Sequence, residues 1–557
     1  MSSAIEEVVK APPFPQRRAK RRGHKSLSFA LIFLAILVVS AVFSGPRFPD
    51  YRPHEAPSNG PLDVVDPQDV AMSKCIDPIR VAADLGLTPC EYVQQSKGCN
   101  DFQAMVPWLE IYYCDMKSSH YLWLIGAVFF ILLGFNLLGT TADDFLCPPL
   151  LHISKFLKLS DALAGVTIIS FANGAPDVFS ILAGNDGEDA TVALGAGLGS
   201  AAFIISLVLG AVVAVNPVTV RKFAFVRDIV ALFIATIAWF AIVADGEIHI
   251  WECIAFLAFY VIYVLVVVVT SGKEAPIDIK IEDEEDGETL IDHSDDEDEE
   301  SGIFGKIMGF CELPFTFLRY VTVPVIENES RFFPFAQILV PLLGSVFFAW
   351  GFEIPEMLPI DPMVTYFIIF IIGAIASLYV AQKIGQDKEL NPNWVATFGV
   401  FVCIVWMFKL ADETVALLRS VGVVLDIPDA ILSLLILSAG NSIGDLATNV
   451  NISKKGRGNM AVAATYAGPL FNVVVGLGVS FLFATMAQDD KVYNLGVTEF
   501  LNPFTVSFIF IAIVLILALL VVPLRKYVIA KGFGIVNVFL YIGYIVAVCL
   551  VAMINGT

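Results

Sequence analysis

Two short stretches of the sequence place the same polar side chains at the same spacing. SFANGAPDVFS begins at residue 170 and SAGNSIGDLAT begins at residue 438, so equivalent positions lie 268 residues apart. In each stretch an asparagine precedes an aspartate by four residues, and the surrounding segment is apolar. The shared positions pair Ser170 with Ser438, Asn173 with Asn441, Asp177 with Asp445 and Ser180 with Thr448.

These side chains are typical of a site for a hard cation. Residues i and i+4 share one face of a helix, so each asparagine points the same way as its aspartate. Carboxylates, amides and hydroxyls offer oxygen ligands, and calcium takes about 6 to 8 of them. Helix-breaking residues nearby predict local unwinding, which would free backbone carbonyls as further ligands. The residues expected to break the helices are Gly174, Pro176, Gly440 and Gly444.

The cost of placing Asp177 and Asp445 in a membrane also favours a bound cation. A charged aspartate at the bilayer centre costs roughly 2.5–3.5 kcal/mol, and two facing carboxylates repel each other. A divalent cation relieves both problems. Polar pairs that only hold helices together would explain one stretch, but they explain two matched stretches less well. Asn472, in the small-residue segment YAGPLFN, is a candidate for a further ligand.

The composition indicates the elements that must position these residues. The chain has 557 residues, is 57% hydrophobic and only 16% charged, and its mean hydropathy is +0.75. This predicts an all-α polytopic membrane protein with about 13 spans. The expected spans are 27–43, 121–139, 160–184, 190–215, 226–244, 250–270, 332–351, 362–381, 393–410, 427–448, 459–486, 503–523 and 533–552.

The distribution of Lys and Arg orients these spans, because short cytoplasmic loops carry the excess of positive charge. With the basic N-terminus inside, the predicted inner loops contain Lys or Arg, whereas three short outer loops contain neither. Lys491, Lys409 and Arg419 are exceptions. In this topology the two polar stretches run in opposite directions. We therefore expect two inverted-topology repeats of about five helices each, plus extra helices, with a site where the repeats meet, as in secondary transporters.

The apolar, basic and acidic stretches divide the chain into six segments. A basic N-terminus with a signal anchor or signal peptide covers 1–45, and a four-cysteine segment, placed outside, covers 46–120. The first repeat covers 121–271, an acidic loop on the cytosolic side 272–331, two additional spans 332–392, and the second repeat 393–557. In the acidic loop, 13 of the 19 residues from Glu282 to Glu300 are acidic. We expect a solvated linker there, with weak calcium sensing as the alternative.

Four cysteines cluster in the segment placed outside, which predicts two disulfides on an oxidising face of the membrane. Unpaired thiols are the alternative, and the sequence leaves the connectivity open. The candidates are Cys75, Cys90, Cys99 and Cys114. The formal net charge of −21 gives no reason to expect nucleic acid as a partner.

The two motifs ANGAPD (172–177) and GNSIGD (440–445) resemble the α-1 and α-2 repeats of the calcium/cation antiporter superfamily. The branch that looks closest is the mitochondrial-type sodium/calcium, or sodium/lithium/calcium, exchanger. The resemblance implies exchange of calcium for sodium, or lithium in its place, by alternating access. It implies no enzymatic activity and no cofactor. It also implies that Asp177 and Asp445 coordinate the transported ions, with Asn173, Asn441, Ser170 and Ser438 around them.

The sequence departs from the family pattern at several positions. Ala172 stands where the family often has glycine, Ala439 where it often has tryptophan, and GSAAFI lacks the asparagine of the commoner GSN-x-F pattern. Asn472 stands where potassium-dependent relatives carry aspartate, which argues against potassium cotransport. Two evident carboxylates also argue against a site that holds three sodium ions together with calcium.

Three other functions remain open at this stage. The first alternative is a calcium/proton antiporter, the second and remote one is an intramembrane aspartyl protease, and the third is an ion channel. The expected partners are calcium and sodium ions and the lipid bilayer, and the sequence names no protein partner. The resemblance suggests the mitochondrial inner membrane, whereas the signal-like N-terminus and external cysteines suggest the plasma membrane or an endomembrane.

Overall fold

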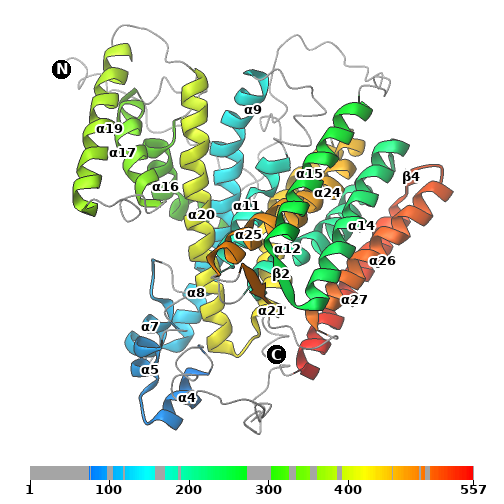
Figure 1. Cartoon of the computed structure of the whole chain (residues 1–557), viewed down its shortest axis with the longest axis horizontal. Helices are drawn as coiled ribbons and strands as arrows, with labels where there is room; N and C mark the ends of the chain where they lie inside the picture. Colours follow the sequence, from blue (N-terminus) through cyan, green and yellow to red (C-terminus); the bar gives the residue numbers. More distant parts are fainter. Residues whose placement is uncertain are drawn as a thin grey trace.

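Helices make up nearly all of the secondary structure in this computed structural model (Figure 1). The structure describes residues 75, 77–96, 99, 105–116, 119–156, 170–185, 190–271, 303–324, 334–351, 361–384, 392–454, 456–488, 491–495 and 502–555. The predicted first span at 27–43 lies outside these residues. So does the strongly acidic stretch at 282–300.

The first repeat runs through five successive helical regions. Several of them contain a π-helical turn, marked η, in which the backbone hydrogen bonds span one residue more than in an α-helix. The elements are α8 His120–Thr140, η2 Thr141–Leu146, α9 Cys147–Phe156, α11 Ser170–Ala183, α12 Thr191–Phe203, η4 Ile204–Val208, α13 Leu209–Val215, α14 Lys222–Asp245 and α15 Ile250–Ser271.

The second repeat has the same sequence of helical regions. The elements are α20 Pro392–Leu425, α21 Asp429–Ile431, η6 Leu432–Leu437, α22 Ser438–Asn441, α23 Ile443–Lys454, α24 Gly458–Phe471, η7 Asn472–Gly476, α25 Leu477–Ala487, α26 Pro503–Leu524 and α27 Lys531–Asn555. The repeat found in the sequence extends to the backbone. The turns η4 and η7 start at residues 204 and 472, which are separated by the same 268 positions as the two polar motifs.

Two small antiparallel sheets join the repeats at opposite ends of the molecule. β1 Val218–Thr219 pairs with β4 Val528–Ile529, and β2 Glu247–His249 pairs with β3 Val492–Asn494. β1 follows the third helical region of the first repeat and β3 follows the third of the second, while β2 and β4 follow the fourth regions. Figure 1 shows β4 and β2 at different ends of the bundle. Strands at equivalent positions of the two repeats therefore lie at opposite ends of the molecule. This is the arrangement expected of inverted repeats, so that prediction is confirmed.

The membrane spans agree with the all-α polytopic prediction. Nine helices of the described chain are long and apolar enough to cross a membrane, and α21–η6–α22 with α23 forms a tenth candidate bent by 41°. Two shorter apolar helices, at Gly174–Ala183 and Gln337–Gly351, fall within two further expected spans. The total of 13 stays a prediction, because the first expected span lies outside the described residues.

Three helices lie between the repeats in the chain (Figure 1). They are α16 Ile303–Thr322, α17 Pro334–Gly351 and α19 Pro362–Ile384. Of these, α17 packs against α20, α16 packs against α17 and α8, and α19 packs against α17. The sequence did not predict α16, which lies within the segment expected to be a loop. Its Arg319 is 1% exposed and donates to the hydroxyls of Thr140 and Thr141, each at 2.9 Å, and to Glu312 at 3.1 Å. These contacts hold α16 against the junction of α8 and η2.

The four-cysteine segment folds into a small unit at the end of the molecule where α8 begins (Figure 1). Cys75 pairs with Cys99 and Cys90 pairs with Cys114. We call residues 75–116 the disulfide unit. Its helices are α4 Pro78–Leu85, α5 Pro89–Gln95, α7 Trp108–Glu110 and η1 Ile111–Asp115. The Glu413 carboxylate of α20 accepts hydrogen bonds from Trp108 Nε1 at 2.7 Å and from the Met105 backbone N–H at 2.9 Å.

Candidate functional site: paired polar motifs between the repeats

Asp177 lies where α11 of the first repeat meets η7 of the second. It is 1% exposed, and its Oδ2 accepts hydrogen bonds from Ser200 Oγ at 2.7 Å and Asn472 Nδ2 at 2.6 Å. Its Oδ1 is buried and accepts no hydrogen bond from any described residue. Since buried polar atoms are nearly always paired, this oxygen points to a ligand such as a cation.

Asn472 is fully buried, and its place beside Asp177 supports its prediction as part of the site. Its amide also donates to Ser200 Oγ at 3.2 Å, so the two side chains together orient the carboxylate. The Oδ1 atom of Asn472 has no donor within the described part of the chain. A carboxylate oxygen and an amide oxygen are thus both available to a cation in this region.

The expected break of the first motif helix is wrong. α11 continues as an α-helix through Gly174 and Pro176 up to Ala183. A proline inside a helix removes one hydrogen bond but need not end the helix when neighbouring helices pack around it. The role of Gly174 is instead close approach, because a Cβ there would lie 2.6 Å from Asn472 Oδ1.

The second motif helix is interrupted between its two glycines. α22 ends at Asn441 and α23 begins at Ile443, with Ser442 between them and a bend of 41°. Gly440 packs against the ring of Phe135, where a Cβ would collide. Gly444 faces open space, since no described atom lies within 4 Å of where its Cβ would be.

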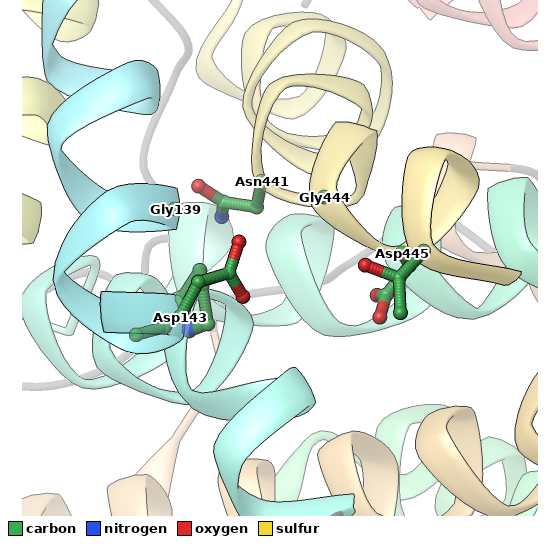
Figure 2. A pocket seen from close by; sticks show the side chains of 8 residues that line it. Gly139, Asp143, Asn441, Gly444 and Asp445 are labelled. Atoms are coloured by element: carbon green, nitrogen blue, oxygen red, sulfur yellow. The ribbon is translucent and has the colours of Figure 1, made fainter. Parts of the chain in front are cut away.

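A small pocket opens beside this break, and Figure 2 shows its lining. Asp445 is partly exposed there, and Asn441 is 7% exposed. Neither the nitrogen nor the oxygen of the Asn441 amide has a hydrogen-bond partner among the described residues. Asp445 lies within range of charge interaction with Asp177. The lining residues are Gly139, Ala142, Asp143, Pro176, Asn441, Gly444, Asp445 and Thr448.

The two motif serines are buried. Ser438 Oγ donates to Leu434 O at 2.5 Å inside the turn that joins η6 to α22, and Ser170 stands at the start of α11. Gly199 of α12 lies so close that a Cβ there would be 2.6 Å from Ser438 Oγ. Asn173 belongs to α11, but its side chain is outside the described part of the structure.

The sequence analysis missed three residues of this region: Ser200, Ser442 and Asp143. Ser200 contacts Asp177 directly, and the Ser442 hydroxyl lies beside the same carboxylate. Ser200 sits in a run of small residues, and such runs usually serve close helix packing. Ser442 lies between Asn441 and Asp445 in the second motif, so the position of the break could have identified it.

The donors gathered here suit a hard cation. Within the described residues no cluster of three or more His, Cys, Asp or Glu side chains is arranged to hold a metal ion. The site instead combines the separate carboxylates of Asp177 and Asp445 with amide and hydroxyl oxygens. Oxygen donors of this kind match calcium and sodium rather than softer metals.

Comparison with known proteins identifies the family. The model of the family described as sodium/calcium exchanger protein matches residues 127–269 and 395–550, which together are more than half of the chain. The two matched regions coincide with the two repeats.

Relatives match over most of the chain. Cation/calcium exchanger 1 of Arabidopsis thaliana is 29% identical and covers 81% of this chain and 85% of its own length. The mitochondrial sodium/calcium exchanger protein of Mus musculus is 27% identical and covers 94% of this chain and 97% of its own length.

Solved exchanger structures are similar at a lower level. A structure of the sodium-calcium exchanger NCX_Mj has a TM-score of 0.38 and 16% identity, covering 76% of this chain and 99% of its own. The H+/Ca2+ exchanger CAX has a TM-score of 0.42 and 12% identity, covering 78% and 91%. The assignment rests on the family match: the chain belongs to the sodium/calcium exchanger family and is a membrane transporter that exchanges calcium for sodium.

Proposed function

We propose that the exchange takes place at one site between α11 and the bent helix η6–α22–α23, where Asp177 and Asp445 bind the ions in turn. The observation that carries this proposal is the unpaired, buried oxygen of Asp177, next to the unpaired amide oxygen of Asn472. Asn441, the last residue of α22 before the break, supplies a third unpaired oxygen. Ser170, Ser438 and Asn173 complete the motifs around these groups.

The charges explain why transport is coupled. Two carboxylates buried in a membrane repel each other and are poorly solvated, so a state without a cation is costly. Calcium offsets both charges, and sodium ions can replace it from either side. The inverted repeats provide two nearly equivalent routes to the same carboxylates, one from each face. The protein then switches readily between its inward-facing and outward-facing states only when a bound cation neutralises the carboxylates. Calcium and sodium are therefore exchanged for each other.

The residues around Asp177 orient its carboxylate for this task. Asn472 and Ser200 both donate to Oδ2, which leaves Oδ1 directed to the ion. Sodium is the counter-ion of the exchange, and we propose that lithium can take its place. Asn472 replaces the aspartate of potassium-dependent relatives, so potassium is not expected to be transported. Protons could also neutralise the two carboxylates, so the uptake experiment below includes a proton gradient as the test of calcium/proton antiport.

The membrane is a further part of the proposal. The matched mouse relative is named as mitochondrial and covers almost the whole chain, which supports the mitochondrial inner membrane. The disulfide unit requires that its side of the membrane be oxidising. Plasma membrane or endomembrane is the alternative. Fractionation of cells that express the tagged chain, with markers for each membrane, decides between them.

Calcium uptake into proteoliposomes tests the function. The purified protein is reconstituted, and uptake is driven in turn by outward gradients of sodium, lithium, potassium and protons. We expect uptake with sodium or lithium that is lost in Asp177→Asn and in Asp445→Asn. Asp228→Asn is the matched control, because Asp228 is also a buried carboxylate but binds Tyr263 and Arg227, away from the motifs.

Each other outcome contradicts a stated part of the proposal. Uptake driven only by protons would establish the alternative antiporter. Uptake that persists in both motif variants would remove Asp177 and Asp445 from the site. Loss of uptake in Asp228→Asn as complete as in the motif variants would show that any buried carboxylate is needed for folding rather than for binding.

A further inference from the structure

A carboxylate other than Asp177 and Asp445 lines the pocket beside the second motif. Asp143 comes from η2 in the first repeat, and it faces Asn441 and Asp445 of the second (Figure 2). It is partly exposed, and it lies within range of charge interaction with Asp445. Two carboxylates from different repeats therefore border the same small space.

The Asn441 amide is an independent sign that this space holds a ligand. Asn441 is more than nine-tenths buried, its side chain lines the pocket, and neither amide atom is paired with a described residue. Leaving a buried amide unpaired costs about 1–3 kcal/mol, so its lack of a partner among the described residues points to a ligand that enters the pocket. The open side of Gly444 leaves room for it.

The position of Asp143 is fixed by its surroundings. Thr141 Oγ1 donates to Leu137 O at 2.6 Å, and the same hydroxyl and that of Thr140 accept from the buried Arg319 of α16. These bonds hold the turn just before Asp143. The hydrogen bonds of η2 span one residue more than those of an α-helix. This changes which side chains of the helix face the pocket, and π-turns are frequent at functional sites.

We propose that Asp143, Asp445 and Asn441 form a first binding position for calcium on its way to Asp177. This inference rests on the proposed function and adds a residue to its route. Two carboxylates and an amide oxygen suit a doubly charged, oxygen-seeking ion. Asp445 then belongs both to this entry position and to the transport site. Calcium can therefore move from Asp143 to Asp177 while it stays bound to Asp445.

The direction of α23 indicates which face of the membrane this position serves. From the pocket, α23 leads toward the β1–β4 sheet, where Ser453 Oγ donates to Val212 O. The segment Ala142-Asp143-Asp144 resembles Ala411-Asp412-Glu413 upstream of the second motif, at an offset of 269 residues rather than the 268 of the motifs. There Glu413 binds the disulfide unit through Trp108 and Met105, and Asp412 does not line the pocket. Of these similar acids, Asp143 lines the pocket, whereas Glu413 holds the disulfide unit.

The test measures the calcium KM separately from each face. Full-length protein is reconstituted in proteoliposomes, and the population in each orientation is selected with an impermeant blocking reagent. We expect Asp143→Asn to raise the KM for calcium about tenfold from the face with the β1–β4 sheet, as expected for one lost ionic contact. The KM from the other face should change by less than about twofold. Asp144→Asn, an exposed neighbour, is the matched control and should behave as wild type.

Two further variants keep the test decisive if Asp143→Asn folds poorly. Asp143→Glu retains the charge and should keep the KM close to wild type. Asp143→Cys should show a high KM that falls after modification with a negatively charged thiol reagent and rises further with a positively charged one. Asp144→Cys treated with the same reagents corrects for the native cysteines.

The outcomes separate this inference from the proposed function. If wild type does not exchange calcium for sodium, the proposed function fails. If wild type exchanges normally and Asp143→Asn matches Asp144→Asn at both faces, only the inference fails. An equal rise in KM at both faces, or a fall in maximal rate that Asp143→Glu does not restore, would assign Asp143 to holding η2 in shape and would also overturn the inference.

Discussion

The amide Nδ2 of Asn472 donates a 2.6 Å hydrogen bond to Oδ2 of Asp177, and the two residues are 295 positions apart in the chain. One belongs to each repeat, so the contact joins the repeats at the proposed binding site. Its strength should affect both ion affinity and the association of the repeats, and these two effects can be separated by mutation.

Replacing Asn472 with alanine should weaken calcium binding more than it weakens the fold. The change removes one of two described donors to Asp177 Oδ2. We expect the calcium KM to rise about tenfold, as for a lost bond to a charged group. Asn185→Ala is the control, because Asn185 also donates across the repeats, to Ser480 O and Oγ. Equal KM values for the two variants would contradict a role for Asn472 in the site.

Replacing Gly174 with alanine should destabilise the protein. The new Cβ would lie 2.6 Å from Asn472 Oδ1 and 3.3 Å from Phe471 Cδ1, so α11 and η7 would have to separate. Overpacking of this kind costs about 1–3 kcal/mol. Thermal unfolding followed by intrinsic fluorescence in detergent measures the change.

Gly468→Ala is the matched control for that measurement. Gly468 lies in α24, and no described atom is within 4 Å of the position of its Cβ. Alanine should stabilise this helix by roughly 0.5–1 kcal/mol. If both variants unfold at the same temperature, the close approach at Gly174 is not as tight as the structure indicates.

Replacing Glu413 with glutamine should loosen the disulfide unit. The side chain keeps its shape but loses the charge that strengthens the bonds from Trp108 and Met105. We expect faster cleavage of residues 75–116 by an added protease, with a loss of about 1–2 kcal/mol. Asp115→Asn, on an exposed side chain of the same unit, should leave the cleavage rate unchanged. A wild-type rate in Glu413→Gln would show that apolar packing alone holds the unit.

Arg319 should be needed for stability because, without it, the charge of Glu312 would be left with the neutral Asn136 amide as its described partner. Arg319→Gln breaks an ion pair in which the arginine side chain is 1% exposed. Loss of one partner of a buried pair costs about 3–5 kcal/mol. The double variant Arg319→Gln with Glu312→Gln should recover part of that loss, because it leaves no unpaired charge. A double variant less stable than the single one would refute this explanation.

The main features of the fold were predictable because the hydrophobic segments are long and the motif pair is specific. Asn472 was predicted as a ligand since an amide in an apolar segment needs a partner, and it lies beside Asp177. α16 was missed because the acidic residues before it dominate the composition of its segment. Its buried Arg319 binds hydroxyls of α8 and η2, and no local pattern indicates such a contact.

The remaining differences in the site have a common cause. Gly174 was expected to break a helix, but it permits the approach of Asn472 from a distant part of the chain. Ser200 looked like a packing residue among glycines and alanines. Asp143 faces the pocket because η2 is a π-turn, and periodicity does not reveal where such turns occur. Each of these roles depends on a neighbour from another helix, which the sequence alone does not place.

The contact between Asp177 and Asn472 also sets an order of events during synthesis. The two residues are separated by 295 positions, and ribosomes add about 5–20 residues per second. Asp177 therefore waits on the order of 15–60 s in the bilayer before its partner is made. During that interval the first half of the chain holds an incompletely paired carboxylate in lipid. We therefore expect the newly made half to need protection from membrane quality-control proteases until the second half arrives.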